Sequence, residues 1–255
     1  MTTFPNCKIN LGLNILRKRT DGYHDIATIF IPVFSLRDRL TIELSHSSET
    51  TIDVTGITID GDPRDNLCFR AWQLLNEEFG LPPVDISLEK NIPFGAGLGG
   101  GSSDAAFVLK MLNELFALHL DEAQLQERAA RLGADCPFFI VNRPVYATGI
   151  GDQLEPIELD FAQMGLTVEI AKPHDSVSTP EAYRGVMPHL AEIDLRHAVR
   201  LPVEQWRETI VNDFERSILA THPSIERLKE DFYRRGAIYA SMSGSGSAVF
   251  GLFRA

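Results

Sequence analysis

Apolar and polar residues alternate at the start of the chain. In the stretch CKINLGLNI the odd positions from Cys7 to Ile15 are apolar, and the even positions are polar or glycine. This period of two predicts a strand, and an Asp-Gly turn at 21–22 followed by a second apolar stretch over 26–36 predicts a hairpin. Further strands are expected where β-branched residues recur among polar ones, over 40–44, 51–59 and 84–92.

Apolar residues at helical spacing predict helices in the first half of the chain. One helix is expected between a cap at Asp65 or Asn66 and the Gly80 that ends it. Another begins with a capping box at Asp121 and stops at Gly133. A third follows the glycine-rich segment that is treated below.

The second half of the chain mixes strands and helices. From 144 to 165, glycines, prolines and acidic residues interrupt the pattern, so we place a domain boundary there. Beyond it we expect a helix opened by Ser178, a strand near 166–171, helices around 203–219 and 223–234, and strands at 237–242 and 248–253. Because these elements show no regular βαβ alternation, the expected class is α+β.

Composition limits the classes of partner. The 255 residues carry 24 Lys and Arg against 35 Asp and Glu, a formal net charge of -11. This balance argues against nonspecific binding to nucleic acid or to an anionic membrane and favours a small ligand. The chain has neither a signal peptide nor about 18 uninterrupted apolar residues, so we expect a cytoplasmic protein. Cys7, Cys68 and Cys136 are widely spaced and are expected to be reduced core residues.

The segment NIPFGAGLGGGSSDAA, residues 91–106, is the least ordinary part of the sequence. Five glycines fall between Pro93 and Ser102. They leave backbone N–H groups open to a ligand, and the segment leads into a helix for which Ser102 or Ser103 is the expected cap and Asp104 suits the first turn. Unpaired N–H groups and the helix dipole favour an anion at such a place. The segment therefore predicts a polyphosphate site.

Three other interpretations of this segment were weighed. Residues 95–100 match G-x-G-x-x-G, but the preceding strand is half polar and the next carboxylates, Asp121 and Glu122, begin a helix, which disfavours a Rossmann site. A Walker A loop needs G-K-[ST] where this chain has G-S-S. The third interpretation is a turn without a ligand. It is disfavoured because each glycine that is ordered on folding destabilises the chain by about 0.5–1 kcal/mol relative to alanine.

The same segment, P-F-G-A-G-L-G-G-G-S-S, resembles the nucleotide loop of the GHMP kinases (galactokinase, homoserine, mevalonate and phosphomevalonate kinases), whose pattern is similar to P-x-x-x-G-L-G-S-S-A-A. Further segments agree in the family's order over nearly the whole chain: K-I-N-L at 8–11, R-x-D-G-Y-H at 19–24, D-N-L at 65–67, L-G-A-D-C-P at 132–137, S-T-P-E-A-Y at 178–183, N-D-F-E at 212–215 and S-G-S-G-S at 243–247. The triple glycine is similar to the branch of the family that acts on a cytidyl-bearing alcohol. The set as a whole is far more specific than any one motif.

The resemblance implies an α+β, two-domain GHMP kinase fold. An N-terminal domain like domain 2 of ribosomal protein S5 is expected over 1–155, and a C-terminal ferredoxin-like domain over 156–255. The chain ends soon after the strand expected at 248–253, so we expect this second domain to be short at its end. The implied cofactors are ATP and Mg²⁺, and the implied partner is one small-molecule substrate. A monomer or weak homodimer is expected.

The resemblance also implies roles for particular residues. Asp135 matches the catalytic base and Lys8 its partner, which would keep the carboxylate ionised and offset charge in phosphoryl transfer. Asn10 shares a strand face with Lys8 and is expected to orient the substrate. The expected ATP-binding residues are Asn66, Pro93, Phe94, Gly95, Ala96, Gly97, Leu98, Gly99, Gly100, Gly101, Ser102 and Ser103.

Substrate contacts are implied by three other matches. Tyr23 and Tyr183 match aromatic positions that sandwich a cytosine ring, and His24 matches a residue that contacts the polar edge of the base. Thr179 and Gly244 are further candidates on the substrate side. The sequence supplies no obvious magnesium cage, and Ser103 is the one candidate metal ligand.

Two alternatives stay open at this point. One is a GHMP kinase for another small alcohol, such as mevalonate or homoserine, which the G-Y-H and S-T-P-E-A-Y segments disfavour. The other is a non-catalytic, ligand-binding relative, and the presence of both Lys8 and Asp135 argues against it.

Overall fold

The computed structural model describes residues 1–58 and 61–255, and its chain forms two compact units. The first unit contains residues 1–7, 33–94 and 99–142, and the second contains 8–32, 95–98 and 143–255. Because the chain passes back and forth between the units, they are spatial groups and not continuous sequence domains. The division at residue 155 stays a prediction.

The first unit is built on a four-stranded sheet of order β1-β4-β6-β5. Its strands are β1 (Thr2–Thr3), β4 (Arg39–Leu44), β6 (Val84–Lys90) and β5 (Thr51–Gly56). β4 pairs antiparallel with β6, and β5 pairs parallel with it. The strand predicted over 51–59 therefore ends at Gly56, and Ile59 lies outside the described residues.

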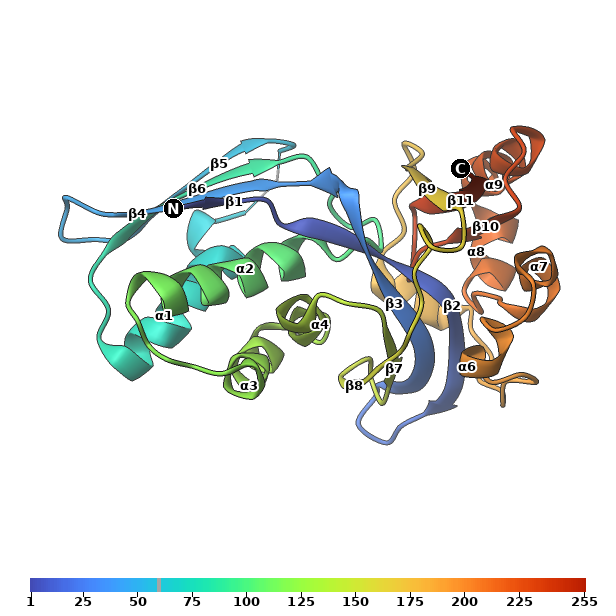
Figure 1. Ribbon diagram of the computed structural model, residues 1–255, viewed down its shortest axis with the longest axis horizontal. Coiled ribbons are helices and arrows are strands. Elements are labelled where there is room, and N and C mark those ends of the chain that lie inside the picture. The colour runs from blue at the N-terminus through green and yellow to red at the C-terminus, as the bar shows by residue number, and fades with distance from the viewer. Residues whose placement is uncertain (59–60) are drawn as a thin grey trace. The chain divides into compact units, whose positions relative to one another are not determined.

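Helices cover one face of this sheet, as Figure 1 shows. They are η1 (Pro63–Asp65), α1 (Leu67–Phe79), α2 (Gly100–Leu115), α3 (Glu122–Leu132) and α4 (Cys136–Val141). The side chain of Asn66 caps α1, Gly80 ends it in the left-handed conformation, and α3 has the predicted capping box at Asp121. The local signals for these two helices are confirmed.

The predicted start of α2 is wrong. The helix begins at Gly100, its N-cap is Gly99 with φ 71, and no side chain caps it. Because glycine adopts this left-handed conformation without strain, the chain enters the helix before it reaches Ser102 or Ser103. Asp104 lies beyond the first turn and is buried, where burial raises its pKa to about 7 against the opposing effect of Lys90.

The second unit holds a sheet of order β2-β3-β7-β8. β2 (Asn6–Lys18) and β3 (His24–Arg37) are neighbours, as the hairpin prediction required, and both strands begin or end in the first unit. β7 (Val145–Thr148) and β8 (Gln153–Pro156) were not predicted; they lie in the stretch assigned to a domain boundary. Each has four residues, too few for a clear alternation, and β7 is stabilised by antiparallel pairing with β3.

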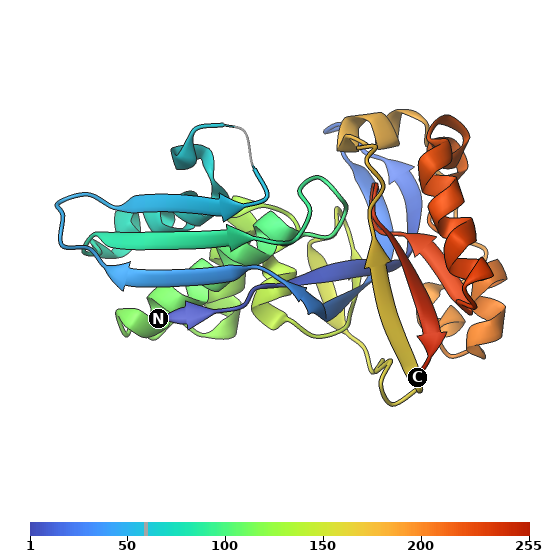
Figure 2. The same cartoon turned by 90° about the horizontal axis from the view of Figure 1, so that it is seen from above.

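A second sheet in this unit has the antiparallel order β10-β11-β9, with β10 (Tyr239–Met242), β11 (Val249–Arg254) and β9 (Leu166–Ala171). Helix α9 (Pro223–Arg234) lies beside it in Figure 2. Phe232 of α9 packs so closely that a Cβ on Gly251 would lie 2.6 Å from its ring. The remaining helices are α5 (Thr179–Arg184), α6 (Leu195–Ala198), η2 (Val203–Gln205), α7 (Trp206–Thr209) and α8 (Glu215–Thr221).

The single helix expected over 203–219 is broken. It is divided into η2, α7 and α8, with an irregular segment at 210–214. The side chain of Asn212, in that segment, bonds to backbone groups elsewhere in the second unit, which favours the break. All three cysteines are buried, and none of them forms a disulfide bond. In the part of the chain that the structure describes, no helix is both long enough and apolar enough to span a membrane.

Candidate functional site

Lys8 is buried in the second unit. Its side chain is 3% exposed, although its polar position in β2 suggested contact with solvent. The Nζ atom donates to Oδ1 of Asn10 at 2.6 Å and to the carbonyl oxygen of Gly97 at 3.0 Å. It also lies 5.0 Å from the centre of the Phe30 ring. The predicted neighbours Lys8 and Asn10 are therefore in direct contact, and a residue of the glycine-rich segment joins them.

The carbonyl oxygen of Gly97 is where three candidate segments meet. It accepts hydrogen bonds from Nζ of Lys8 and, at 2.9 Å, from the hydroxyl of Ser243 in the S-G-S-G-S segment. The φ of Gly97 is +74, and a Cβ there would lie 2.0 Å from the carbonyl oxygen of Ser243. Only glycine fits this approach. We call this arrangement of Lys8, Gly97 and Ser243 the Gly97 junction.

Asn10 is held in a fixed orientation. Its Nδ2 donates to the hydroxyl of Thr28 at 3.0 Å, and that hydroxyl donates to the carbonyl oxygen of Gly12 at 2.6 Å. The amide oxygen is therefore directed at Lys8. A Cβ on Gly244 would lie 3.2 Å from the same oxygen, so this candidate substrate residue packs closely against Asn10.

The S-G-S-G-S segment at 243–247, which we call the second glycine segment, is anchored by two residues that are not among the predicted site residues. Nδ2 of Asn212 donates to the carbonyl oxygens of Met242 and Gly244, both at 2.8 Å, and its side chain is 2% exposed. Oε1 of Glu215 accepts from the backbone N–H of Met242 at 2.7 Å. Both residues belong to the N-D-F-E motif. The signal that could have revealed them is a pair of polar residues inside an otherwise amphipathic helical stretch.

The aromatic candidates for cytosine binding lie in the second unit. The rings of His24 and Tyr183 are stacked with centroids 4.7 Å apart and an interplanar angle of 22°, and Phe214 meets the Tyr183 ring edge-on at 4.9 Å. Tyr23 is 61% exposed. Burial, with a smaller effect of the Lys18 charge, lowers the pKa of His24, which favours the neutral imidazole. A neutral imidazole offers one donor and one acceptor.

Thr179 lies beside the S-G-S-G-S segment. Its hydroxyl is 3.3 Å from that of Ser245. Thr179 is the first residue of α5, and the hydroxyl of Ser178 accepts from the backbone N–H of Glu181 to cap that helix. The predicted opening of this helix at Ser178 is therefore confirmed, and the substrate contact of Thr179 stays a prediction.

The first unit holds the ends of the glycine-rich segment. Asn66 uses its side-chain oxygen to accept from the N–H of Cys68 at 2.9 Å, and Phe94 is exposed. Ser103 is fully buried, and its hydroxyl has no hydrogen-bond partner among the described residues. This orphaned oxygen keeps Ser103 as a candidate metal ligand. No group of three or more His, Cys, Asp or Glu in the described ranges is arranged to hold a metal ion.

Asp135 is the N-cap residue of α4 in the first unit, where the apolar residues 138–141 form most of a short buried helix. Its neighbour Cys136 is buried, which raises the pKa of that thiol to about 11. Lys8 belongs to the second unit, so its partnership with Asp135 stays a prediction.

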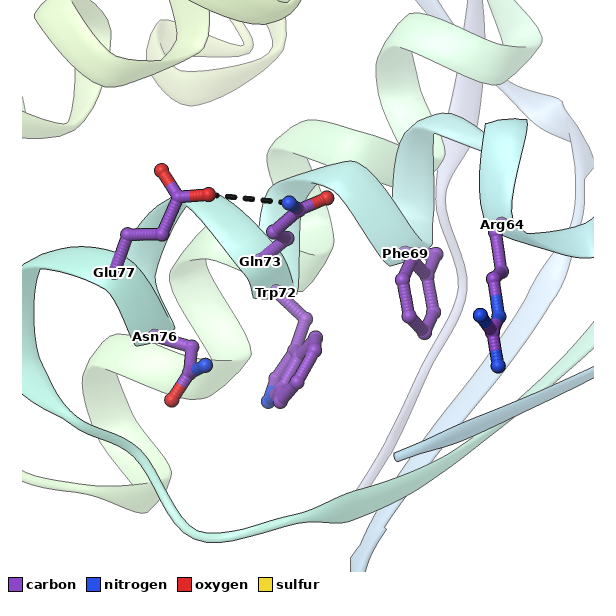
Figure 3. Close-up of a pocket in the computed structure, with 6 residues that line it drawn as sticks. All are labelled: Arg64, Phe69, Trp72, Gln73, Asn76 and Glu77. Atoms are coloured by element: carbon purple, nitrogen blue, oxygen red, sulfur yellow. Dashed lines mark hydrogen bonds between the residues drawn. The ribbon is translucent and has the colours of Figure 1, made fainter. Parts of the chain in front are cut away.

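An open groove of about 390 Å³ runs along α1 in the first unit, as Figure 3 shows. It is lined by Arg64, Phe69, Trp72, Gln73, Asn76 and Glu77. Gln73 donates to Glu77 across one turn of the helix at 3.1 Å. The residues that line this groove are not among the predicted site residues, so it is a separate surface feature.

Comparisons with known proteins identify the family. Residues 66–143 match the model of the GHMP kinases N terminal domain, and residues 198–255 match that of the GHMP kinases C terminal domain. The chain therefore belongs to the GHMP kinases, with the α+β fold of that family.

Relatives of known name show which branch of the GHMP kinases the chain belongs to. The 4-diphosphocytidyl-2-C-methyl-D-erythritol kinase of Bacteroides fragilis (strain YCH46) is 51% identical over 255 residues, covering 99% of this chain and 92% of that protein. The protein of the same name from Porphyromonas gingivalis is 47% identical over 256 residues, covering 100% and 92%. A crystal structure of 4-(cytidine 5'-diphospho)-2C-methyl-D-erythritol kinase matches with a TM-score of 0.84 and 36% identity, covering 99% of this chain and 90% of the other. Within the GHMP kinases, the chain belongs to the family of 4-diphosphocytidyl-2-C-methyl-D-erythritol kinases.

More distant structures share the fold alone. A homoserine kinase from Cytophaga hutchinsonii matches with a TM-score of 0.66 at 19% identity, covering 98% of this chain and 85% of that one.

Proposed function

We propose that this chain transfers the γ-phosphoryl group of ATP to the 2-hydroxyl of 4-diphosphocytidyl-2-C-methyl-D-erythritol, giving the 2-phosphate and ADP. This is a step in non-mevalonate isoprenoid precursor biosynthesis. The observation that carries the proposal is the Gly97 junction, where a buried lysine, the glycine-rich segment and the second glycine segment share one carbonyl oxygen. Such an arrangement fixes a positive charge beside a phosphate-binding backbone.

In this proposal Asp135 and Lys8 act on the reacting groups. The Asp135 carboxylate orients the 2-hydroxyl and accepts its proton while the oxygen forms a bond to the γ-phosphorus and the bond to ADP breaks. The Lys8 ammonium stabilises negative charge on the acceptor oxygen and the transferring group. The acceptor is a crowded tertiary hydroxyl, so correct positioning supplies much of the rate enhancement.

The ATP phosphates bind to the backbone of residues 93–103 and to the N-terminus of α2. The helix begins at Gly100 without a side-chain cap, so its first N–H groups have no cap side chain competing with a phosphate. Mg²⁺ neutralises part of the phosphate charge when it is bound, and the orphaned hydroxyl of Ser103 is the candidate protein ligand. Asn66, at the start of α1, is a further ATP-binding residue in this proposal.

The cytidyl group binds among the aromatic residues of the second unit. Tyr23 covers one face of the base and Tyr183 the other, while His24 bonds to its polar edge. Because His24 stacks on one face of Tyr183, the base reaches that face only when the imidazole turns aside. Thr179 and Gly244 complete the substrate side. We expect a monomer or weak homodimer that needs neither nucleic acid nor a membrane.

The decisive experiment measures ADP release with four acceptors: the cytidyl substrate, mevalonate, homoserine and galactose. We expect turnover with the cytidyl substrate, and turnover with a different alcohol alone would overturn the substrate proposal. The Asp135→Asn variant should lose about 100-fold or more of kcat. The matched control is Asp53→Asn, which changes an exposed carboxylate of β5 in the same unit. Undiminished turnover in Asp135→Asn would refute the base assignment and leave the substrate assignment standing.

A further inference from the structure

Three buried charged side chains form a cluster in the first unit. Lys90 is 2% exposed, Asp38 is 0% exposed and Asp104 is 1% exposed. Nζ of Lys90 donates to Oδ2 of Asp38 and, at 2.6 Å, to Oδ2 of Asp104. We call these residues the buried triad. Neither Lys90 nor Asp38 is among the predicted site residues.

The buried triad joins the two ends of the glycine-rich segment. Lys90 is the last residue of β6, and Asp104 lies in α2, on the far side of the glycines. Oδ1 of Asp38 accepts from the backbone N–H groups of Asn91 at 2.5 Å and Ile92 at 2.8 Å. The backbone at 91–92, where the segment begins, is therefore connected through Asp38 and Lys90 to Asp104 in the helix that follows the glycines.

The start of α2 packs directly against this cluster. A Cβ on Gly100 would lie 2.8 Å from a methyl group of Ile92 and 3.4 Å from Nζ of Lys90. The two ends of the segment are thus held within van der Waals distance of each other. A shift of Lys90 would move the first turn of the helix relative to the exit of β6.

The energetics of the buried triad favour a positioning role over a purely stabilising one. Two carboxylates share one ammonium, and Oδ1 of Asp104 has no hydrogen-bond partner among the described residues. Buried ion groups of this kind are often no more stabilising than apolar side chains of the same volume, because desolvation offsets the attraction. What the charges add over apolar packing is a directional set of bonds.

We propose that Lys90 is a positioning residue for ATP: held between Asp38 and Asp104, it fixes the two ends of the glycine-rich segment in the shape that the phosphates require. The inference rests on the proposed function, since it assigns this segment to ATP. Lys90 acts through the backbone and does not touch the nucleotide.

The first test compares Lys90→Met with Glu89→Gln. Methionine has a similar length without the charge, and Glu89 is the exposed neighbour of Lys90 on β6. We expect Lys90→Met to raise the KM for ATP about tenfold or more, because small displacements of a binding backbone are costly. The KM for the cytidyl substrate should change less than about twofold, and Glu89→Gln should match the parent. A general loss of structure would change both KM values together, and that result, or no change in either, would overturn the inference.

A second pair of variants keeps the test decisive if Lys90→Met does not fold. Asp104→Asn retains an acceptor for Lys90 at nearly the same volume, whereas Asp104→Leu has a side chain branched at the same atom, larger and without an acceptor. We expect the KM for ATP of Asp104→Asn to stay within about threefold of the parent and that of Asp104→Leu to rise about tenfold. Equal values would show that only packing matters at this site and would refute the positioning role.

Direct binding separates this inference from the proposed function. The dissociation constant of a non-hydrolysable ATP analogue is measured for the unchanged chain and for each variant. Binding to the unchanged chain that weakens in Lys90→Met and Asp104→Leu supports the positioning role even if the acceptor alcohol proves to be a different one. Absence of binding to the unchanged chain would refute both proposals, and equal binding to all variants would refute the positioning role alone.

Discussion

Nζ of Lys8 donates to Oδ1 of Asn10 at 2.6 Å, and both side chains are buried. The orientation of Asn10 is set from the other side by its bond to Thr28. The amide oxygen of Asn10 and the carbonyl oxygen of Gly97 therefore both accept from the ammonium and fix its position. An ammonium kept in this way can stabilise charge that develops during phosphoryl transfer.

Replacing Lys8 tests this role. In Lys8→Met we expect kcat to fall about 100- to 1,000-fold, the usual effect of removing one group that stabilises transition-state charge. Lys18→Met, at the exposed end of the same strand, is the control and should keep the parent kcat at pH 8. Asn10→Asp should also lower kcat, because a carboxylate would pair with the ammonium and reduce its effect. Steady-state kinetics with saturating ATP measures all three, and a Lys8→Met enzyme with parental kcat would contradict the assignment.

Gly97 should not tolerate any side chain. In Gly97→Ala the new Cβ would collide with the carbonyl oxygen of Ser243, in addition to the cost of about 1–2 kcal/mol for a left-handed alanine. Gly80→Ala is a matched control, since Gly80 has φ +63 and no described atom lies within 4 Å of its Cβ position. We expect Gly80→Ala to lose about 1–2 kcal/mol of stability with unchanged kcat/KM, and Gly97→Ala to lose kcat/KM by tenfold or more as well. Thermal unfolding and kinetics measure both, and equal behaviour of the two variants would contradict the close contact at the Gly97 junction.

Local signals in the sequence predicted the parts of the fold that depend on neighbouring residues. The period of two gave the β2–β3 hairpin, the Asn66 cap gave α1, and the capping box at Asp121 gave α3. The predicted start of α2 was wrong because the left-handed Gly99 caps the helix, three or four residues before the expected serine caps. The strands β7 and β8 were not predicted because each has only four residues, too few for a clear alternation, and because β7 depends on pairing with the distant strand β3.

In the candidate site, too, features that depend on local spacing were predicted, and features that depend on distant residues were not. The shared strand face of Lys8 and Asn10 followed from their spacing, but the burial of Lys8 did not, because it depends on Gly97, which is 89 residues away. Lys90 is in phase with the buried apolar residues of β6, so the alternation indicates its burial, but its two carboxylate partners come from other elements. Such long-range partners are not encoded in hydrophobic periodicity.

Asn212 should be essential for the second glycine segment. In Asn212→Ala two buried carbonyl groups, those of Met242 and Gly244, lose their donor, so we expect a loss of about 2–4 kcal/mol in the free energy of unfolding. The KM for the cytidyl substrate should rise more than that for ATP, because the proposed function places this segment on the substrate side. Asn76→Ala, on α1, should change stability by less than about 0.5 kcal/mol and serves as the control. Denaturant unfolding and kinetics give both quantities; a stability change as small as that of the control would refute the anchoring role.

His24 should make substrate binding sensitive to acid. Its pKa lies below the usual value of 6.5 because burial, and to a smaller extent Lys18, disfavours the charged ring. The neutral imidazole can present a donor and an acceptor to the cytosine edge, so the KM for the cytidyl substrate should be constant above pH 6.5 and rise as the pH falls through the lowered pKa of this ring.

The same titration affects folding with a defined sign. Since the folded chain favours the neutral ring, stability from this group is present above pH 6.5 and is lost as the pH falls through the lowered pKa. His24→Gln keeps a donor and an acceptor without titrating, so its KM should lose the acid dependence. His174→Gln changes an exposed histidine of the second unit and should retain the parent profile. The measurement is KM against pH at saturating ATP, and an unchanged acid rise in His24→Gln would show that a different group causes it.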